Sequence, residues 1–472
     1  MALLQATIRD ETPAAASLPE GRARAGESAP LPLQDAASAA LLHGQYDNML
    51  SCIRCGLCLS VCPTYQISFA EEEGPRGRIA MARAVAEGHL PLTADTVEHS
   101  QTCLLCDACT AICPAGVRME PLGTMMREVF LRNRPHGRRE RLLRWLVFQK
   151  LFADMDRFRR ACRLGRIYQR SGARWLLRKS RLLALFRLAM LEWLLPQMPG
   201  RFLVPRGQRW RPAGGEPNRR VGLFAGCIMS TAYAETDRAT ARMLARSGAE
   251  VVAVAGQGCC GALHVHNGEV EGARALARRN IEAFERIPDA AIVVNAAGCG
   301  STLKGYGHLL HDDSAYAERA SAFAARVRDV NEELAAANLP AASAAADLTV
   351  TLQEPCHLAH AQRIREAPRR LLKALHGLTL VEMSEPALCC GSAGIYNVLQ
   401  RERADALQAR KIENVRASGA PVVVTSNPGC QLQLESGLTR TGLDVRVRHI
   451  VDLLDEAYGG AAAGDVFEEP GR

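Results

Sequence analysis

The chain has 472 residues, of which 48% are apolar and 23% charged, and its net charge is +8. This length exceeds what one hydrophobic core supports, so about three domains are expected. The composition is that of an ordinary globular protein and argues against a fibrous or disordered chain. The sequence also lacks the uninterrupted stretch of roughly 20 mostly apolar residues that a membrane-spanning helix needs.

Seventeen cysteines, an odd number, require a chemical role. The first 40 residues are Ala-rich and polar, without the basic start and apolar stretch of an exported chain. We therefore expect a cytoplasmic protein, in a reducing compartment where thiols serve as metal ligands or redox groups more often than as disulfides. Residues 1–45 are predicted to form a flexible N-terminal tail and residues 459–472 a C-terminal one.

Two cysteine runs mark a mainly helical domain predicted at residues 46–133. Both have the spacing C-x2-C-x2-C-x3-C-P, at residues 52–63 and 103–114. Such a run supplies three thiolates from one tight loop, and in two-cluster ferredoxins the fourth ligand is the Cys-Pro cysteine of the other run. Zinc sites, the alternative, normally use separated C-x2-C pairs. We therefore assign one [4Fe-4S] cluster to Cys52, Cys55, Cys58 and Cys113, and a second to Cys103, Cys106, Cys109 and Cys62.

The segment between the runs is predicted to be largely helical. A helix is expected from Ile79 to Gly88, with the glycine as its C-terminal cap. The preceding Gly74–Arg78 segment is predicted to be a compact basic turn. Two interpretations stay open for it: a loop packed near an anionic cluster, or an ordinary solvated loop.

A basic connector is predicted at residues 134–218. From residue 132 to residue 220 the chain has 24 Lys/Arg against 5 Asp/Glu. These charges alternate with Leu, Trp and Phe at 142–152 and 175–186, a pattern typical of amphipathic helices that bind a membrane surface or an acidic partner subunit. Helices that only pack between domains are the alternative, and no nucleic-acid partner is expected because no recognition fold surrounds the arginines. Cys162 has no partner by pattern and is interpreted as a free thiol.

From residue 219 the sequence repeats itself, which predicts a first Cys-Cys-Gly domain at 219–345 and a second at 346–458. Corresponding cysteines are offset by 129, 130 and 131 residues, as expected of an internal duplication. Short apolar strands alternate with helical stretches, which predicts βαβ units around a parallel sheet. The strands start at Val221, Val251 and Ala291 in the first unit and at Leu348, Leu378 and Val422 in the second. The predicted fold class is therefore multidomain, a helical two-cluster ferredoxin domain followed by duplicated α/β domains.

Each of these strands is followed by cysteines, at the sheet edge where ligand sites of α/β folds form. Gly261 and Gly391, which follow the paired cysteines, would let the backbone approach a bound ligand. Small buried residues at strand ends are the alternative interpretation. The candidate ligands of further Fe-S or metal centres are Cys227, Cys259, Cys260 and Cys299 in one unit and Cys356, Cys389, Cys390 and Cys430 in the other. Two interpretations are open for four nearby histidines: they hydrogen-bond a cluster or a quinone, or they are packing residues without such a role. These histidines are His264, His266, His357 and His360.

Motifs for substrate chemistry are absent from the sequence. It has no G-x-G-x-x-G after a strand, no P-loop and no nucleophile–base signature. We therefore assign no catalytic residue. A chain with clusters but no flavin or nicotinamide motif is expected to relay electrons between other components.

The combined pattern resembles the iron-sulfur subunits of bacterial glycolate oxidases, from Asp47 to Asp455. Besides the cluster runs, the resemblance is carried by the segments 73–79, 258–262, 356–362 and 388–394. It implies an oxidoreductase complex acting on the CH-OH group of 2-hydroxy acids. Flavoprotein subunits holding FAD would oxidise glycolate to glyoxylate. This subunit would pass the electrons towards membrane quinone, in peripheral contact with the cytoplasmic face of the inner membrane.

Related arrangements occur more widely and leave an alternative open. Lactate-utilisation proteins, the third subunit of anaerobic glycerol-3-phosphate dehydrogenase and heterodisulfide reductase subunits resemble this chain in the cluster runs and the Cys-Cys-Gly units. In that alternative the Cys-Cys-Gly centres are themselves redox-active. Heterodisulfide reductase places Cys-x-x-Cys at the end of each repeat, whereas this sequence has Cys299-Gly-Ser-Thr302 and Cys430-Gln-Leu-Gln433. One ligand per repeat is therefore missing relative to that pattern.

Overall fold

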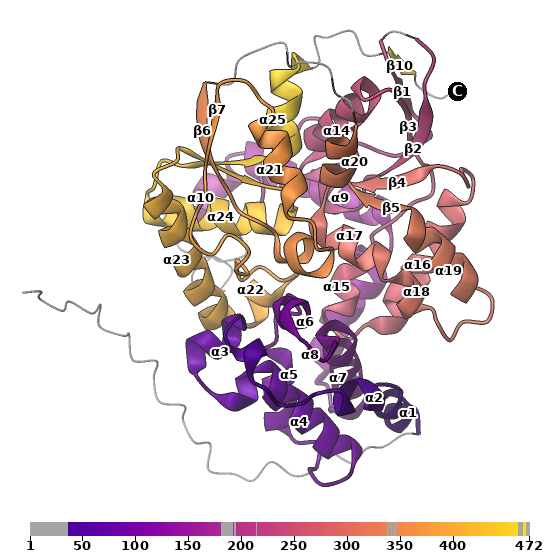
Figure 1. Cartoon of the computed structure of the whole chain (residues 1–472), viewed down its shortest axis with the longest axis vertical. Coiled ribbons are helices and arrows are strands. Elements are labelled where there is room, and N and C mark those ends of the chain that lie inside the picture. The colour runs from indigo at the N-terminus through magenta and orange to yellow at the C-terminus, as the bar shows by residue number, and fades with distance from the viewer. Residues whose placement is uncertain are drawn as a thin grey trace, which may run out of the picture.

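A computed structural model describes residues 36–180, 192, 195–213, 215–337, 339, 342, 347–460 and 466–468. A helical N-terminal domain lies at one end of the molecule, below two α/β units that stand side by side (Figure 1). The predicted tail at 1–35, the end of the C-terminal tail at 469–472 and the second amphipathic stretch of the connector at 181–186 lie outside the described residues.

The helical domain packs around a small apolar core. Its elements are α1 (Ala36–Gly44), α2 (Tyr46–Leu50), η1 (Leu57–Leu59), α3 (Pro63–Ser68), η2 (Glu71–Glu73), α4 (Pro75–Ala86), α5 (Ala94–Gln101), α6 (Ala108–Ile112) and α7 (Met119–Asn133). Leu42 of α1 is buried against α7, and Asn133 Nδ2 donates to Ser38 Oγ at 2.8 Å. Residues 36–45 therefore belong to this domain, and the prediction that the tail extends to residue 45 is wrong.

Helix α4 begins earlier than predicted. Pro75 occupies its first turn, where the missing N–H costs nothing because that group would have no partner inside the helix. The segment predicted as a basic turn is therefore the start of α4, and the helix predicted from Ile79 continues it.

The connector is helical and then enters the first sheet. It contains α8 (Arg138–Arg144), the π-helical η3 (Trp145–Leu151), α9 (Met155–Arg170) and α10 (Ala173–Lys179). Asp154 caps α9 by accepting from the N–H groups of Asp156 and Arg157. Further on, β1 (Arg209–Arg211) pairs with a strand of the first α/β unit, so the predicted connector boundary at residue 218 is too late.

The first α/β unit is a six-stranded sheet with the order β10-β1-β3-β2-β4-β5. Strand β10 (Val466–Glu468) pairs antiparallel with β1, so part of the predicted C-terminal tail is a strand. The other strands are β2 (Arg219–Phe224), β3 (Ala249–Ala253), β4 (Ala291–Val294) and β5 (Val327–Asp329). The helices are α13 (Ile228–Thr231), α14 (Ala234–Arg246), α15 (Ala262–Val265), α16 (Val270–Phe284), α17 (Ala297–Lys304), α18 (Tyr306–Leu309), α19 (Ala317–Arg326) and α20 (Val330–Ala336).

The second unit is a four-stranded sheet with the order β7-β6-β8-β9, which repeats the β3-β2-β4-β5 part of the first sheet. Its strands are β6 (Leu348–Leu352), β7 (Leu378–Val381), β8 (Val422–Thr425) and β9 (Arg446–His449). Its helical elements are η4 (His357–Ala361), α21 (Glu366–Lys373), α22 (Tyr396–Leu399), α23 (Arg401–Ser418), α24 (Pro428–Thr441) and α25 (Ile450–Ala457). All neighbours in this sheet, and β2 to β5 in the first, pair in parallel. The predicted duplication of parallel α/β units is therefore confirmed.

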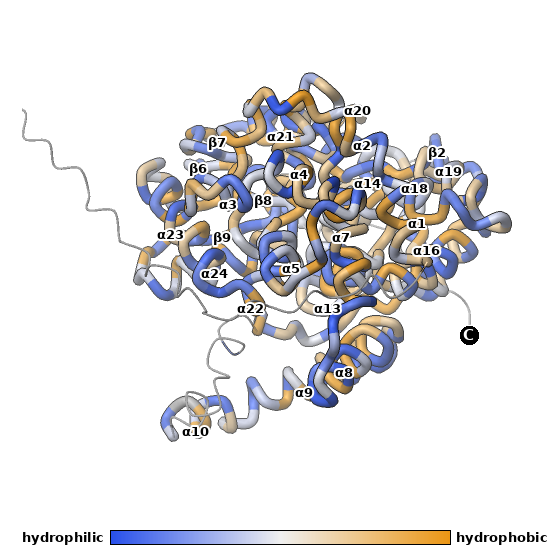
Figure 2. Tube along the Cα trace, turned by 90° about the horizontal axis from the view of Figure 1, so that it is seen from below, coloured by the Kyte–Doolittle hydropathy of each residue, from blue (hydrophilic) through white to orange (hydrophobic). Residues whose placement is uncertain are grey.

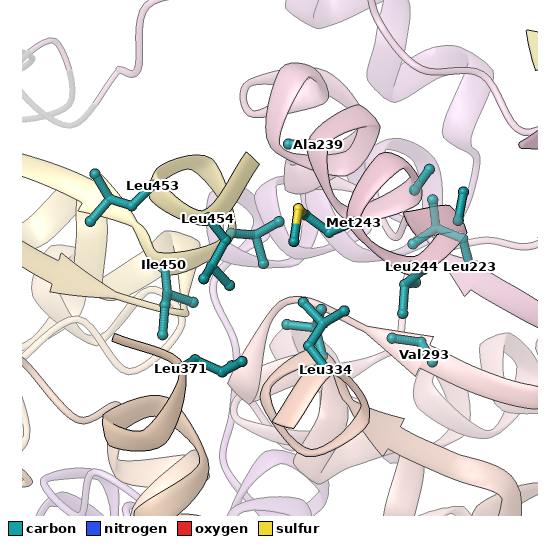
Figure 3. Packing of buried hydrophobic residues seen from close by; sticks show 14 of the residues in the cluster. Leu223, Ala239, Met243, Leu244, Val293, Leu334, Leu371, Ile450, Leu453 and Leu454 are labelled. Carbon is teal, nitrogen blue, oxygen red and sulfur yellow. The ribbon is translucent and has the colours of Figure 1, made fainter. Parts of the chain in front are cut away.

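The two units share one hydrophobic core instead of having separate ones. Met243 of α14 and Leu334 of α20 meet Leu371 and Leu454 of the second unit (Figure 3). Arg242 Nη2 lies 2.6 Å from Asp455 Oδ2 across the same junction. The two sheets are thus held in a fixed relation. None of the helices in the described ranges is long and apolar enough to cross a membrane.

We predict that Leu454→Ala destabilises both units together. The side chain is 1% exposed, and truncating a buried leucine costs about 2–5 kcal/mol. Thermal unfolding followed by circular dichroism should show one transition at lower temperature. Glu456→Ala, at a side chain 61% exposed on the same helix, should leave the transition within about 0.5 kcal/mol of the parent. Separate transitions, with only one shifted, would contradict a shared core.

Candidate functional site

The two cysteine runs adopt the same backbone conformation. In the first run, Arg54 and Gly56 have left-handed backbone conformations, with φ of 57° and 84°. In the second run, Leu105 and Asp107 have the same conformation, with φ of 51° and 57°. Three of these four residues are not glycine, and each carries a conformational cost in this region. Left-handed residues on both sides of the middle cysteine curl each loop around a common centre. The loops are therefore shaped to direct several thiols to one place.

The first run and the remote cysteine of the second surround one small cavity. Cys52, Cys55, Cys58 and Cys113 line this space of about 30 Å³, together with Cys109. Cys55 is exposed to solvent, whereas the others are partly buried. Four thiols around one cavity, with the fourth coming from the other run, form a donor set that fits a cubane cluster.

The thiols assigned to the second cluster also lie near one another, but deeper in the protein. Cys62, Cys103 and Cys106 are buried. Burial raises the pKa of the Cys109 thiol well above its usual range, and the neighbouring Cys103 and Cys62 raise it further. Cys62 is thus grouped with the second run, although it is adjacent in sequence to the first. The structure therefore places Cys113 at the cavity of the first run and Cys62 near the second run, and ligation by the two predicted sets stays a prediction.

Buried arginines lie beside the second run. Arg78 donates to Glu73 Oε2 at 3.0 Å and to Thr102 Oγ1 at 2.8 Å, and Arg127 donates to the carbonyl of Cys103. Burial opposes the charge on Arg78, but the negative groups around it, Cys103 first among them, raise the pKa of its guanidinium overall. Arg78 therefore lies beside the second run, in keeping with the first interpretation of the 74–78 segment. The half-buried Arg76 instead lies at the first run, where it pairs with Glu71 at 2.5 Å and donates to the carbonyl of Arg54 at 3.3 Å.

The Cys-Cys-Gly cysteines form two equivalent sets. In the first unit, Cys227 Sγ lies 3.6 Å from Cys259 Sγ, and Cys260 Sγ lies 3.2 Å from Cys299 Sγ. In the second, the corresponding thiols pair in the same way, Cys356 with Cys389 and Cys390 with Cys430. Hydrogen bonds from neighbouring thiols hold the pKa of Cys259, and equally that of Cys390, well below the usual range. The pKa of Cys356 is lowered too, chiefly by its hydrogen bond with Cys389, and the thiolate is the form that a metal requires.

All eight cysteines of these sets line a single cavity of about 370 Å³. It lies between the two units, and most of its remaining wall is apolar, including Phe224, Val294 and Ile395. The helical domain contributes Leu104, and the connector contributes Phe152 and Leu195. Sequence reasoning placed each set at the rim of its own sheet but could not show that the two rims face each other.

The glycines after the paired cysteines allow the backbone to pass close to neighbouring helices. Gly261 and Gly391 have φ of +89° and +85°, and a Cβ on Gly391 would lie 2.7 Å from the carbonyl oxygen of Ala404. A Cβ on Gly261 would similarly meet Ala273 Cα at 3.4 Å. These glycines therefore let the cysteine loops lie close to α16 and α23.

The second unit contacts the loop of the second cysteine run directly. His357 Nε2 lies 2.8 Å from the carbonyl oxygen of Leu105, and Tyr396 donates to the carbonyl of Thr102 at 3.0 Å. Cys106 packs in the same apolar cluster as Cys389. Tyr396 lacks a recognisable signal in the sequence, because its role depends on contact between distant segments.

The remaining candidate histidines and the lone thiol have mainly structural contacts. His264 Nε2 lies 2.9 Å from the carbonyl oxygen of Phe148, and His360 Nε2 lies 3.2 Å from that of Ala387. His266 lines the eight-cysteine cavity and lies against His357 with ring centroids 5.5 Å apart. Cys162 is buried in the core of the first unit, which raises the pKa of its thiol.

Comparison with known families matches the same divisions of the chain. A 4Fe-4S dicluster domain matches residues 48–117, and a cysteine-rich domain matches 221–304 and 350–435. The linker region of the glycolate oxidase iron-sulfur subunit matches 139–195. These matches cover both cysteine runs, most of the connector helices and all eight cysteines of the Cys-Cys-Gly units.

Two relatives align over most of the chain. The probable glycolate oxidase iron-sulfur subunit of Bacillus subtilis is 39% identical over 418 residues, covering 87% of this chain and 94% of the relative. The glycolate oxidase iron-sulfur subunit of Escherichia coli is 32% identical over 411 residues, covering 86% and 93%. Lactate utilization protein A of Bacillus subtilis is 29% identical over 238 residues, covering 50% of this chain and 99% of that protein.

Crossed ligation predicts an unusual pattern of iron loss. Cys62→Ser should remove the cluster of the second run, so adding Cys106→Ser should cause no further loss. Adding Cys55→Ser instead should remove the remaining cluster as well, a loss of about eight irons per chain in all. Iron analysis of the anaerobically purified variants measures this. The reverse result, with Cys55→Ser adding nothing, would show that each run supplies all four of its own ligands.

Arg78→Gln should affect the second cluster far more than Arg76→Gln. Removing one partner of a buried ion pair costs about 3–5 kcal/mol of folding free energy, whereas an exposed pair contributes at most about 1 kcal/mol. Loss of the buried cation should also lower the reduction potential of the nearby cluster, because reduction adds negative charge. Denaturant unfolding and redox titration followed by EPR test both effects. Equal effects of the two variants would contradict the assigned role of Arg78.

Proposed function

The chain belongs to the family of glycolate oxidase iron-sulfur subunits, and we propose that it is the electron-transfer subunit of a glycolate dehydrogenase complex. Flavoprotein partners would oxidise glycolate to glyoxylate, and membrane quinone would take up the electrons at the cytoplasmic face. When bound, the two [4Fe-4S] clusters would accept the two electrons of a reduced flavin one at a time. The observation that carries the proposal is the continuous series of cysteines from the surface at Cys55 to the eight-cysteine cavity.

An apolar surface around the first run supports docking of the flavoprotein there. Ile53, Leu57 and Ile112 are 68%, 49% and 40% exposed, although each is a large apolar side chain. Ile53 and Leu57 line the cavity of the first run itself. Exposed apolar side chains that gather at one place are typical of protein interfaces. Electrons from the flavin would therefore enter at Cys52–Cys58.

Contacts between the second run and the second unit support the next stage. His357 and Tyr396 hold the loop of the second run by hydrogen bonds. Arg403 Nη2 adds an ion pair with Glu73 at 3.1 Å. Because Cys106 and Cys389 share an apolar cluster, no solvent layer separates the second run from the cysteine cavity.

We further propose that the cavity thiols hold additional iron-sulfur centres, one for each set of four. Two observations support this assignment: thiols of the first unit pair within 3.2–3.6 Å of one another, and all four thiols of each set line the same cavity. The missing fifth cysteine of each repeat distinguishes these sets from the heterodisulfide reductase pattern. The shared cavity also favours a second candidate function, in which the cavity thiols themselves carry out redox chemistry as in the heterodisulfide-reductase-like alternative.

Co-purification of the tagged chain tests the proposed function. A flavoprotein should accompany the chain, and glycolate added without oxygen should bleach the visible absorption of the clusters. Ile53→Gln should weaken this association, because it removes an apolar contact at the proposed docking surface. Leu399→Gln, at a side chain 63% exposed in the second unit, serves as the matched control. A partner that reacts with neither glycolate nor lactate would refute the proposal.

Iron content separates the two accounts of the cavity. Clear excess over the roughly eight irons of two cubanes would indicate centres in the cavity. In that case Cys259→Ser with Cys260→Ser should lower iron towards that value and abolish turnover, while the EPR signals of both cubanes persist. If iron stays near eight in the parent and turnover still falls in the variant, the thiols themselves are the redox groups.

A further inference from the structure

Apolar side chains are exposed along the connector. Of the fifteen large apolar side chains that are exposed in the described part of the chain, eight lie here: Leu142, Leu143, Trp145, Leu146, Leu164, Ile167, Trp175 and Leu176. Leu164 is 67% and Trp175 is 63% exposed. We refer to these eight residues as the connector face. Such a concentration of exposed apolar surface marks an interaction site.

The opposite side of the same helices is firmly anchored. Phe148, Phe158 and Cys162 are buried against the first α/β unit. Arg144 Nη2 pairs with Glu269 Oε1 at 2.9 Å, and Phe148 packs edge-on against His264 with centroids 5.3 Å apart. Helices α8, η3 and α9 are therefore held in place on their inner side, and the exposure of their outer side is not a result of poor packing.

The connector face is surrounded by positive charge. Residues 134–180 contain 15 Lys/Arg against 3 Asp/Glu, and the acidic side chains are already paired with neighbouring basic groups. Lys150 lies over the ring of Trp145 and Lys179 over that of Trp175, each at 4.7 Å from the centroid. Trp beside long basic side chains is the composition of helices that lie in the headgroup region of a bilayer. The charge complements anionic lipid headgroups.

The shape of this region favours a lipid surface over a protein groove. Helices α8, α9 and α10 lie along one edge of the molecule, outside the body formed by the other domains (Figure 2). The apolar side chains are distributed over α8, η3, α9 and α10. An extended basic edge with separate apolar side chains matches a bilayer, which accepts each side chain independently.

The connector also forms part of the cysteine cavity. Phe152 follows η3 directly, and both it and Leu195 line the wall of the eight-cysteine cavity. The segment that carries the connector face is therefore continuous with the cavity wall. A bilayer bound at this face would lie beside the proposed electron exit.

We propose that the connector face binds the surface of an anionic phospholipid bilayer and so positions the eight-cysteine cavity where quinone dissolved in the bilayer can reach it. The leucines and tryptophans enter the headgroup boundary, and the surrounding arginines contact lipid phosphates. Only the delivery of quinone rests on the proposed function. Lipid binding itself depends on the connector alone.

Vesicle flotation of the anaerobically purified complex tests the lipid contact. Binding should be at least about tenfold stronger to vesicles with about 30% phosphatidylglycerol than to pure phosphatidylcholine, and about 0.5 M salt should weaken it. Combined Leu164→Gln, Ile167→Gln and Trp175→Gln should reduce binding at least about tenfold, and these exposed positions tolerate the changes without loss of folding. Leu399→Gln replaces an equally exposed leucine outside the connector and should bind as the parent does.

Two quinones separate this inference from the proposed function. The triple variant should still reduce a water-soluble short-chain quinone with glycolate but reduce a long-chain quinone in vesicles at least about tenfold more slowly. Unchanged vesicle binding by the triple variant would overturn the lipid contact. A second result would also overturn it: the parent complex does not bind vesicles and the triple variant loses the flavoprotein. The connector face would then be a protein interface. A parent complex that binds vesicles but reduces neither quinone would refute the proposed function and leave the lipid contact intact.

Discussion

A cubane cluster needs four thiolates, whereas one C-x2-C-x2-C loop supplies three, and in this chain each such loop is followed by one further cysteine, Cys62 or Cys113. Under the predicted crossed ligation the fourth ligand comes from the other run, and the loops pack with Cys113 at the cavity of the first run and Cys62 near Cys109 of the second. The left-handed residues at 54, 56, 105 and 107 curl both loops in the same way. The second set of thiols lies deeper in the protein, where Arg78 and Arg127 provide buried positive charge.

The two cysteine runs lie in different surroundings, and so do the two α/β units. One run stays at the surface, and the other contacts the second α/β unit through His357 and Tyr396. The duplicated units, joined by a shared core, turn their cysteine edges towards each other and enclose a single cavity. Their neighbours differ, because the second unit holds the cluster loop while the first holds the connector through His264. Two copies of one fold have thus taken different positions along one proposed electron route.

Local patterns in the sequence were sufficient for much of this architecture. The cysteine spacings indicated the two cluster runs, and apolar segments bounded by cysteines predicted β2, β3, β4, β6, β7 and β8. Strands β5 and β9 were missed because arginines interrupt their short apolar pattern. The two strands are nevertheless equivalent, since each ends in a residue, Asp329 or His449, whose side chain caps the following helix. Helix α1 and strand β10 lie in segments without a strong pattern of their own and are stabilised by distant partners. The single cavity could not be predicted either, since it depends on how two separate sheets pack.

The central claim is that electrons leave through the eight-cysteine cavity after passing the two cysteine runs. Stopped-flow spectroscopy of the complex carrying Cys390→Ser tests this order most directly. Glycolate should bleach the clusters of the variant at the parent rate, and subsequent addition of quinone should fail to restore their absorption. Restoration at the parent rate would contradict the account, because electrons would then reach quinone without passing the cavity.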